Sequence, residues 1–474
     1  MQNLKNRMLR TKPVSQQISE LKRTLGAFDL TLLGIGAIIG AGIFVLTGIA
    51  AATSAGPAIV FSYLLAGLAC TFTALSYAEL STSIGGCGSA YGYAYAGFGE
   101  FIAWIIGWDL ILEYGVAVSA VAIGWSSYFN NALTAIGYEL HVSLSNNIFE
   151  GGFVNLSAML IVLITTALLA VGIKASKYFN SMMVFIKFLT ILIFITIAAF
   201  HVEPQNWSPF VPFGWMGVVE GAALIFFSYI GFDAISTAAE ETIDPQKNMP
   251  IGILSSLIIC TVLYMLVAAL LTGIAPYYTL NVSSPVSAAL LEIGYDFAAA
   301  IVAAGAIAGL TTVILVMFYG LTRIFLAMSR DGLLPNLFSK VNTNTRTPVR
   351  IIISGGIVIS LIAGFAPMST ITELVNIGTL MAFVVVCGGV IAMRYTQPDL
   401  KRPFKVAFHP LIPLLGIAIC LFLALSLPVE TWIRFGIWMA IGCALYFVYG
   451  MFNSGLEKGT NKTVDIEDLD NSNY

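Results

Sequence analysis

The sequence predicts an all-α integral membrane protein, and three observations lead to that prediction. The chain has 474 residues, of which 58% are hydrophobic and 10% are charged, whereas a soluble domain has about 25% charged residues. Apolar segments long enough to cross a bilayer recur along most of the chain. Lysine and arginine are concentrated in alternate connections between those segments. A chain of this composition cannot cover its apolar content with a water-soluble surface.

Twelve segments are expected to cross the membrane as helices, because each offers roughly the 20 mostly apolar residues that a span requires. The segments 98–129 and 297–328 are longer and are expected to tilt or to extend beyond the bilayer. In chain order the expected spans are 28–50, 57–82, 98–129, 153–172, 177–200, 215–238, 250–273, 297–328, 351–366, 371–393, 408–428 and 431–453.

Basic residues predict which side of the membrane each connection faces, since lysine and arginine accumulate on the cytoplasmic side. Of the 22 lysines and arginines, only Lys187 and Arg434 depart from an alternating pattern. The connections at 131–152, 201–214 and 274–296 contain neither residue type. We therefore expect a multi-pass protein of the cytoplasmic (inner) cell membrane, with both termini in the cytoplasm.

The regions outside the spans are polar. Residues 1–27 are expected to form a cytoplasmic N-terminal segment, and they do not resemble a cleavable signal peptide. Residues 454–474 are acidic and are expected to form a disordered cytoplasmic tail. The transmembrane domain is then 28–453.

Two spans carry signals for an interrupted helix. The first contains GIGAIIGAGIF (34–44), and the sixth contains FFSYIGFDAIS (226–236). Close packing through small residues could explain either glycine cluster alone. The two spans are five apart and run in opposite directions, however, and interrupted spans at matching positions of two repeats indicate a transporter's binding site. The sequence thus predicts inverted repeats at 28–200 and 215–393, followed by two extra helices at 408–453.

Interrupted helices in the membrane would expose backbone groups that can bind a zwitterion. Free N–H groups where the outer half of the first span begins suit a carboxylate. Free carbonyl groups where the first half of the sixth span ends suit an ammonium group, so the pair fits an α-amino acid. Phe227 could also close over the ligand, although ordinary packing is the alternative. The residues expected to bind substrate backbone are Ile39, Gly40, Ala41, Gly42, Phe227, Ser228 and Ile230.

Four charged residues lie within spans: Lys187, Asp109, Glu113 and Asp233. Each costs about 2.5–3.5 kcal/mol at a helix centre unless it points inward and finds a partner. Asp233, with Gly231, is expected to support the sixth-span break by accepting backbone N–H bonds. Asp109 and Glu113 project from one face of the third span. The role of Asp109 stays open, and Glu79 near the inner end of the second span is either structural or part of a gate.

Several motifs, in this order, resemble the amino acid–polyamine–organocation permeases, and specifically the bacterial branch related to the cationic amino acid transporters. This resemblance implies a leucine-transporter-type fold, with a 5+5 inverted repeat, broken helices 1 and 6 and two C-terminal helices. It also implies amino acid transport coupled to protons or to exchange. One departure is STSIGGCGSAY (81–91), where relatives commonly carry a proline, which leaves the geometry of that loop in doubt. The motifs are GAIIGAGIFVLTG (36–48), GCGSAYGYAYAGFGE (86–100) after YAEL, GWDLILEYG (107–115), YIGFDAISTAAEE (229–241) and RYTQPDLKRPFKV (394–406).

The resemblance also implies roles for three side chains. Proton-coupled members place a fifth-span lysine where sodium-coupled proteins of this fold hold an ion, which suggests that Lys187 carries the coupling proton and braces the broken first span. Burial disfavours the charged form of an amine, so such a lysine could lose its proton. The alternative is a static partner for one of the carboxylates. The resemblance places Glu113 near the side-chain pocket, opposite Met317, where it would receive a cationic side chain or bond a polar neighbour.

The leading hypothesis is therefore a secondary active transporter that imports L-amino acids, with H+ as the coupling ion. The alternatives are an amino acid or amine exchanger and an amino acid sensor that does not transport. An enzyme is not expected, because the three histidines lie outside the apolar centres and the six cysteines are scattered. No metal, other cofactor or nucleic acid is expected, and neutral and cationic substrates are not distinguished. The expected partners are the L-amino acid and the lipid bilayer.

Overall fold

A computed structural model describes residues 7–11, 24–84, 90–172, 177–233, 235, 236, 238, 242–342, 345 and 347–458. Part of the N-terminal segment 1–27, most of the acidic tail and the centre of the 81–91 loop lie outside these residues. The described chain forms helices, helical turns and connections, with two isolated bridges, Leu25 to Thr242 and Asn147 to Phe153.

The first five predicted spans all contain helix. The first is interrupted and continues into the second through the short turn Gly56–Ala58. The connections add two short helices, α5 (Ala90–Gly97) and α7 (Val142–Ser145). The spans correspond to α2 (Ala27–Ile38) with η1 (Gly42–Leu46), α3 (Thr47–Ala50) and η2 (Ala51–Ala55); α4 (Ile59–Ile84); α6 (Glu100–Ala135); α8 (Leu156–Val171); and α9 (Lys177–Ala199).

The remaining predicted spans are also helical. The connection before the eighth span contains α12 (Pro285–Glu292). The spans correspond to α10 (Gly214–Ile225) with η6 (Phe226–Tyr229); α11 (Pro245–Ile274); α13 (Asp296–Arg330); α14 (Val349–Phe365); α15 (Met368–Thr396); α16 (Leu411–Leu425); and α17 (Val429–Leu445) with η10 (Tyr446–Gly450) and α18 (Met451–Asn453).

Length and composition divide these helices into two groups. Among the described residues, seven helical stretches are long and apolar enough to cross a membrane. Five further apolar helices are shorter: Ala27–Ile38, Leu156–Val171, Gly214–Tyr229, Val349–Phe365 and Leu411–Leu425. The protein is therefore a multi-pass, all-helical protein, and the full set of twelve crossings stays a prediction.

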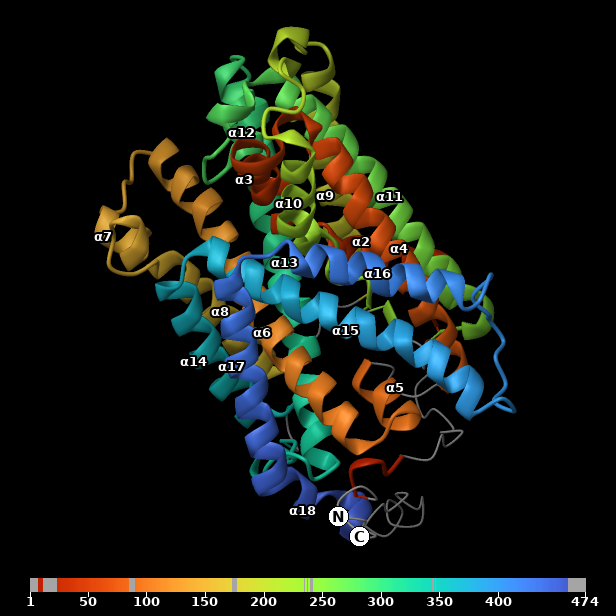
Figure 1. Ribbon diagram of the computed structural model, residues 1–474. Helices are drawn as coiled ribbons and strands as arrows, with labels where there is room; N and C mark the ends of the chain where they lie inside the picture. Colours follow the sequence, from red (N-terminus) through yellow and green to blue (C-terminus); the bar gives the residue numbers. More distant parts are fainter. Residues whose placement is uncertain are drawn as a thin grey trace.

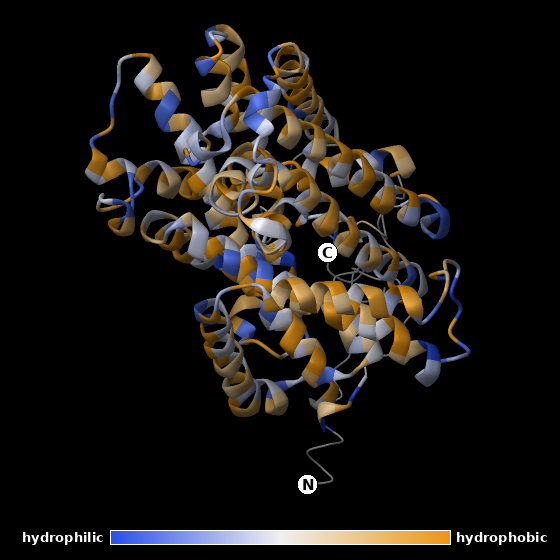
Figure 2. Ribbon diagram, turned by 45° about the horizontal axis from the view of Figure 1, so that its top comes forward, coloured by the Kyte–Doolittle hydropathy of each residue, from blue (hydrophilic) through white to orange (hydrophobic). Residues whose placement is uncertain are grey.

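Helix α6 lies at the centre of the packing. It packs against α13, α15, α8 and α14, and α11 packs against α4 and α2 (Figure 1). Residues on nearly every side of α6 are buried, as expected for a helix that is apolar all round. Hydrophobic residues line the outer helices, and hydrophilic residues gather mostly at helix ends and in connections (Figure 2).

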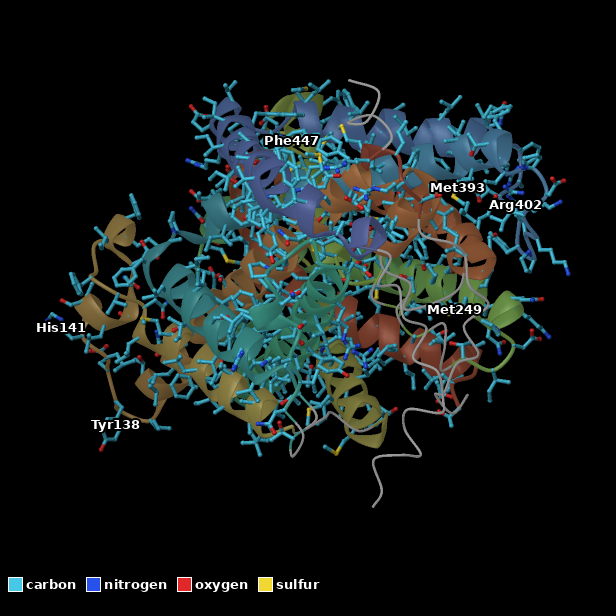
Figure 3. The ribbon with its side chains drawn as sticks, turned by 90° about the horizontal axis from the view of Figure 1, so that it is seen from below. Tyr138, His141, Met249, Met393, Arg402 and Phe447 are labelled. Atoms are coloured by element: carbon cyan, nitrogen blue, oxygen red, sulfur yellow. The ribbon has the colours of Figure 1, made fainter. Side chains whose placement is uncertain are left out.

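A buried carboxylate fixes the connection between α15 and α16. Glu79 of α4 accepts hydrogen bonds from Arg394 Nε at 2.9 Å and from the Val406 backbone N–H at 2.7 Å. Arg402, next to Met393 at one edge of Figure 3, donates to the Met393 carbonyl oxygen at 2.7 Å. These contacts tie the connection between α15 and α16 to α4, a structural role for Glu79.

Candidate functional site

The first span is interrupted at its glycine cluster. Helix α2 ends at Ile38, Ile39 has an extended backbone with φ −72° and ψ 103°, and the next helical turn begins at Gly42. Gly40, Ala41 and Gly42 are the first residues of the outer helical half, and the first N–H groups of a helix have no partner within it. These donors mark the N-terminal end of the outer half of the span, where a helix end attracts anions.

The sixth span is interrupted beside the first. Its α-helix ends at Ile225, and after the turn η6 the backbone becomes extended at Ile230, with φ −62° and ψ 135°. Gly231 has φ +115°, a conformation that favours glycine. A Cβ atom on Gly231 would lie 3.0 Å from the Ala37 carbonyl oxygen, and one on Gly42 would collide with Ser228. The two breaks therefore touch, and both need glycine to do so.

The carbonyl groups of the second break differ from the prediction. The Phe227 carbonyl accepts from the Ile230 N–H at 3.2 Å, and the Ser228 carbonyl accepts from the Tyr264 hydroxyl at 2.9 Å. The prediction of free carbonyls is therefore wrong for these two groups, although a carbonyl oxygen has a second lone pair. The Ser228 hydroxyl, in contrast, is buried and has no hydrogen-bond partner in the described structure.

A narrow cavity lies between the two breaks. The predicted substrate-binding residues Gly40, Ala41, Gly42, Phe227, Ile230 and Met317 line it, whereas Ile39, Ser228 and Glu113 do not. Helix α6 contributes Val121, and α13 contributes Val313 together with Met317. The complete lining is Ala37, Ile38, Gly40, Ala41, Gly42, Val121, Phe227, Ile230, Val313 and Met317.

Lys187 of α9 binds the end of α2. Its side chain is fully buried, and its Nζ atom donates to the carbonyl oxygens of Gly36 at 2.6 Å and Ile39 at 3.0 Å. Gly36 lies in the last turn of α2 and Ile39 directly follows it, where carbonyl groups lack helical partners. Gly309 of α13 makes room, since a Cβ atom there would lie 3.0 Å from Lys187 Cε. No described carboxylate forms an ion pair with Lys187, so the contacts favour a brace over a static ion pair.

Tyr264 of α11 joins the two breaks and is absent from the sequence predictions. Its hydroxyl group lies 2.9 Å from the carbonyl oxygens of Ile38 and Ser228. It has one proton, so the two carbonyls share one donor. Its ring packs against Tyr63 and Tyr229 at centroid distances of 5.2 and 5.5 Å. The sequence signal for such a residue was a tyrosine within a predicted span, because a buried tyrosine hydroxyl group usually finds a hydrogen-bond partner.

The carboxylates of the third and sixth spans form a separate polar region. Asp109 and Glu113 of α6 are buried, and Asp109 Oδ1 and Glu113 Oε1 have no hydrogen-bond partner in the described structure. Asp233 Oδ2 accepts from the Tyr114 hydroxyl at 2.7 Å, which ties the sixth span to α6. The backbone N–H bonds expected for Asp233 stay a prediction.

Asn376 of α15 is a second residue that the sequence did not single out. Its side-chain amide donates to the carbonyl oxygens of Ala223 at 2.7 Å and Leu224 at 3.1 Å, near the end of α10. These carbonyls precede the break and would otherwise lack one of their partners. Asn376 therefore supports the sixth-span break from a neighbouring helix, as Lys187 supports the first-span break.

Comparison with known proteins gives a consistent family. The family model for amino acid permeases matches residues 25–452. The methylthioribose transporter of Bacillus subtilis (strain 168) is 50% identical over 454 residues, which cover 95% of this chain and 98% of that protein. The branched-chain amino acid permease BcaP of the same organism is 49% identical over 96% of this chain and all of its own length. Cationic amino acid transporter 4 (vacuolar) of Arabidopsis thaliana is 38% identical over 80% of this chain and 64% of its own length.

Proposed function

Since this chain belongs to the amino acid permease family and is a membrane transporter rather than an enzyme, we propose that it imports L-amino acids across the cell membrane by proton symport. By name, its relatives transport branched-chain amino acids, cationic amino acids or methylthioribose. They agree on transport and differ in substrate, so the substrate must be argued from the site.

One observation carries the proposal: the cavity lies against unpaired backbone donors at a helix break. Gly40, Ala41 and Gly42 line the cavity, and their N–H groups, at the start of the outer helical half, have no partner within that helix and can donate to a carboxylate. The buried Ser228 hydroxyl lies against Gly42 and can supply a further donor. On the other side, Phe227 and Ile230 line the cavity, and their carbonyl oxygens can accept from an ammonium group.

Lys187 supplies a physical route to proton coupling. When charged, its ammonium group donates to the Gly36 and Ile39 carbonyls, and charge-assisted bonds are roughly twice as strong as neutral ones. Loss of the proton weakens the hold on the end of α2. Because α2 is the inner half of the broken span, its release accompanies opening of the site toward one side of the membrane. The proton and the substrate are then linked through the same break.

Uptake into proteoliposomes tests the proposal. Radiolabelled alanine should accumulate when a pH gradient, acidic outside, is imposed, and accumulation should collapse when a protonophore is added. Lys187→Ala should lose most of this gradient-driven accumulation, whereas a matched change at Lys401, which is exposed in the connection after α15, should retain it. Full gradient-driven accumulation by Lys187→Ala would remove Lys187 from proton coupling.

Two alternatives give different results in the same preparation. An exchanger takes up label only when the liposomes are loaded with unlabelled amino acid, whether or not a pH gradient is present. A sensor binds amino acids without uptake under either condition. Accumulation in empty liposomes that follows the pH gradient excludes both alternatives.

A further inference from the structure

We infer that a folded segment between α6 and α8, residues 146–155, inserts an apolar edge into the outer surface of the lipid bilayer. The edge consists of Ile148, Phe149 and Phe153, and its partner is the interface between lipid and water. This inference goes beyond the proposed function, because it concerns how the molecule is held in the membrane and not what it transports. It rests on the predicted crossing of the membrane by α8 and α14.

The segment 146–155 exposes three large apolar side chains. The exposed fractions are 75% for Phe149, 63% for Phe153 and 55% for Ile148. The bridge between Asn147 and Phe153 brings Phe153 beside the other two. The segment follows α7, which projects from the helices on the side of α8 (Figure 1). Neighbouring exposed apolar side chains mark a contact with a protein or a membrane, and aromatic residues are enriched where a membrane meets water.

The backbone of this segment is bonded internally. Asn147 is 1% exposed, and its Oδ1 atom accepts from the N–H groups of Phe149 at 2.9 Å and Glu150 at 3.1 Å. The Phe153 N–H donates to the Ser143 carbonyl oxygen at 3.0 Å. A polar group that leaves water without a hydrogen bond is costly. Because these donors already have partners, the apolar edge can leave water without that cost.

The helices α8 and α14 set the depth of the segment. The Asn147 amide donates to the Ala366 carbonyl oxygen at 3.4 Å, and the Asn155 N–H donates to the Gly364 carbonyl oxygen at 2.9 Å, both at the outer end of α14. With 16 and 17 residues, α8 and α14 are about 24 and 26 Å long, whereas the hydrocarbon core is about 30 Å thick. Their outer ends therefore lie near the boundary of the core, and the segment that is bonded there lies at the lipid interface.

The surroundings of the edge favour lipid over a second protein. The Phe153 ring packs edge-on against Phe365 at a centroid distance of 6.3 Å. Leu361 and Val358 lie four and seven residues before Phe365, on the same face of α14, and are 48% and 56% exposed. This face contacts hydrocarbon when α14 crosses the membrane, so the edge continues a lipid-facing surface. The connection 131–152 contains no lysine or arginine, so burial of apolar area drives the insertion rather than attraction to anionic headgroups.

Fluorescence quenching in nanodiscs tests this inference. Phe149→Cys is prepared in the full-length protein with Cys87 and Cys443 replaced by serine and is labelled with an environment-sensitive fluorophore. Asn281→Cys, exposed in the polar connection before α12, carries the same label as the control. We expect spin-labelled lipid to quench the label at position 149 severalfold more than the label at position 281, and aqueous iodide to quench it severalfold less.

Each other outcome contradicts the inference. Strong iodide quenching at position 149, equal to that at position 281, would place the edge in water. Quenching by neither agent would show that protein covers the edge, and loss of lipid quenching at high salt would show attraction to headgroups. Phe153→Cys is a second reporter that should give the same result as Phe149→Cys. Alanine uptake by the labelled proteins shows that they are folded and tests the proposed function separately.

Discussion

At the residue scale, the two breaks depend on side chains that donate to backbone carbonyls. Lys187 serves Gly36 and Ile39, and Tyr264 is shared between Ile38 and Ser228. The lysine could be predicted, because a charge inside an apolar span stands out. Tyr264 could not, because a chain with 19 tyrosines gives no sign of which hydroxyl group reaches the breaks.

Removal of the Tyr264 hydroxyl group should destabilise both breaks. In Tyr264→Phe, a buried carbonyl loses its donor, which costs about 1–3 kcal/mol of folding free energy. We expect a lower unfolding temperature in detergent and slower alanine uptake at an equal amount of protein. Tyr278→Phe is the control, since Tyr278 is 69% exposed. Uptake and stability equal to the wild type would show that the shared hydrogen bond has no part in the breaks.

At the sixth-span break, the backbone of Gly231 has a positive φ that favours glycine. Gly231→Ala places a Cβ atom 3.0 Å from the Ala37 carbonyl oxygen at φ +115°, and such strain costs about 1–3 kcal/mol. Substrate affinity and uptake should both fall, measured by calorimetry and in proteoliposomes. Gly388→Ala in α15 is the matched control, because a Cβ atom there meets open space and alanine favours a helix by about 0.5–1 kcal/mol. Normal binding by Gly231→Ala would contradict the account of the break.

At the element scale, the helices and the positions of the breaks could be read from local sequence. The runs of apolar residues predicted where helices occur, and the clusters at Gly40–Gly42 and Ser228–Gly231 predicted where two of them stop. What supports each break could not be read, because the donors come from α9, α11 and α15, which are remote in the chain. The bonding state of the Ser228 carbonyl was mispredicted for the same reason, whereas the Phe227 carbonyl bonds locally to the Ile230 N–H at the turn η6.

Asn376 tests this cross-helix support. Asn376→Ala leaves the Ala223 and Leu224 carbonyls at the end of α10 without its amide, which should cost about 1–3 kcal/mol. Asn376→Asp is more severe, because a carboxylate cannot donate to a carbonyl. We therefore expect thermal stability and uptake to fall in the order wild type, alanine, aspartate. An aspartate variant as active as the wild type would refute a donor role for Asn376.

At the scale of the whole molecule, the helix contacts follow the predicted repeat. In a repeat of five spans, α2 corresponds to α10 and α4 corresponds to α11. The contact between α2 and α11 therefore corresponds to the contact between α10 and α4, and both contacts are present. The contact of α9 with α13 likewise becomes that of α15 with α6, and both are present. The contacts α4 with α11 and α6 with α13 map onto themselves. This pairing supports two structurally related halves.

The number of crossings determines which side of the membrane each connection faces, and this can be measured. With twelve spans, Val142 follows the third and Lys401 follows the tenth, so they lie on opposite sides, with Val142 outside. If only the seven long helical stretches crossed, these residues would follow the second and the sixth crossing and would lie on the same side. Both positions are exposed.

Single cysteines at these positions separate the two arrangements. In a background with Cys87 and Cys443 replaced by serine, leaving four buried cysteines, Val142→Cys should react with a membrane-impermeant maleimide in intact cells. Lys401→Cys should react only after the cells are permeabilised, because an odd number of crossings separates it from Val142. Reaction of both in intact cells would contradict twelve spans with cytoplasmic termini, and with them the five-plus-five repeat that sets the two breaks face to face.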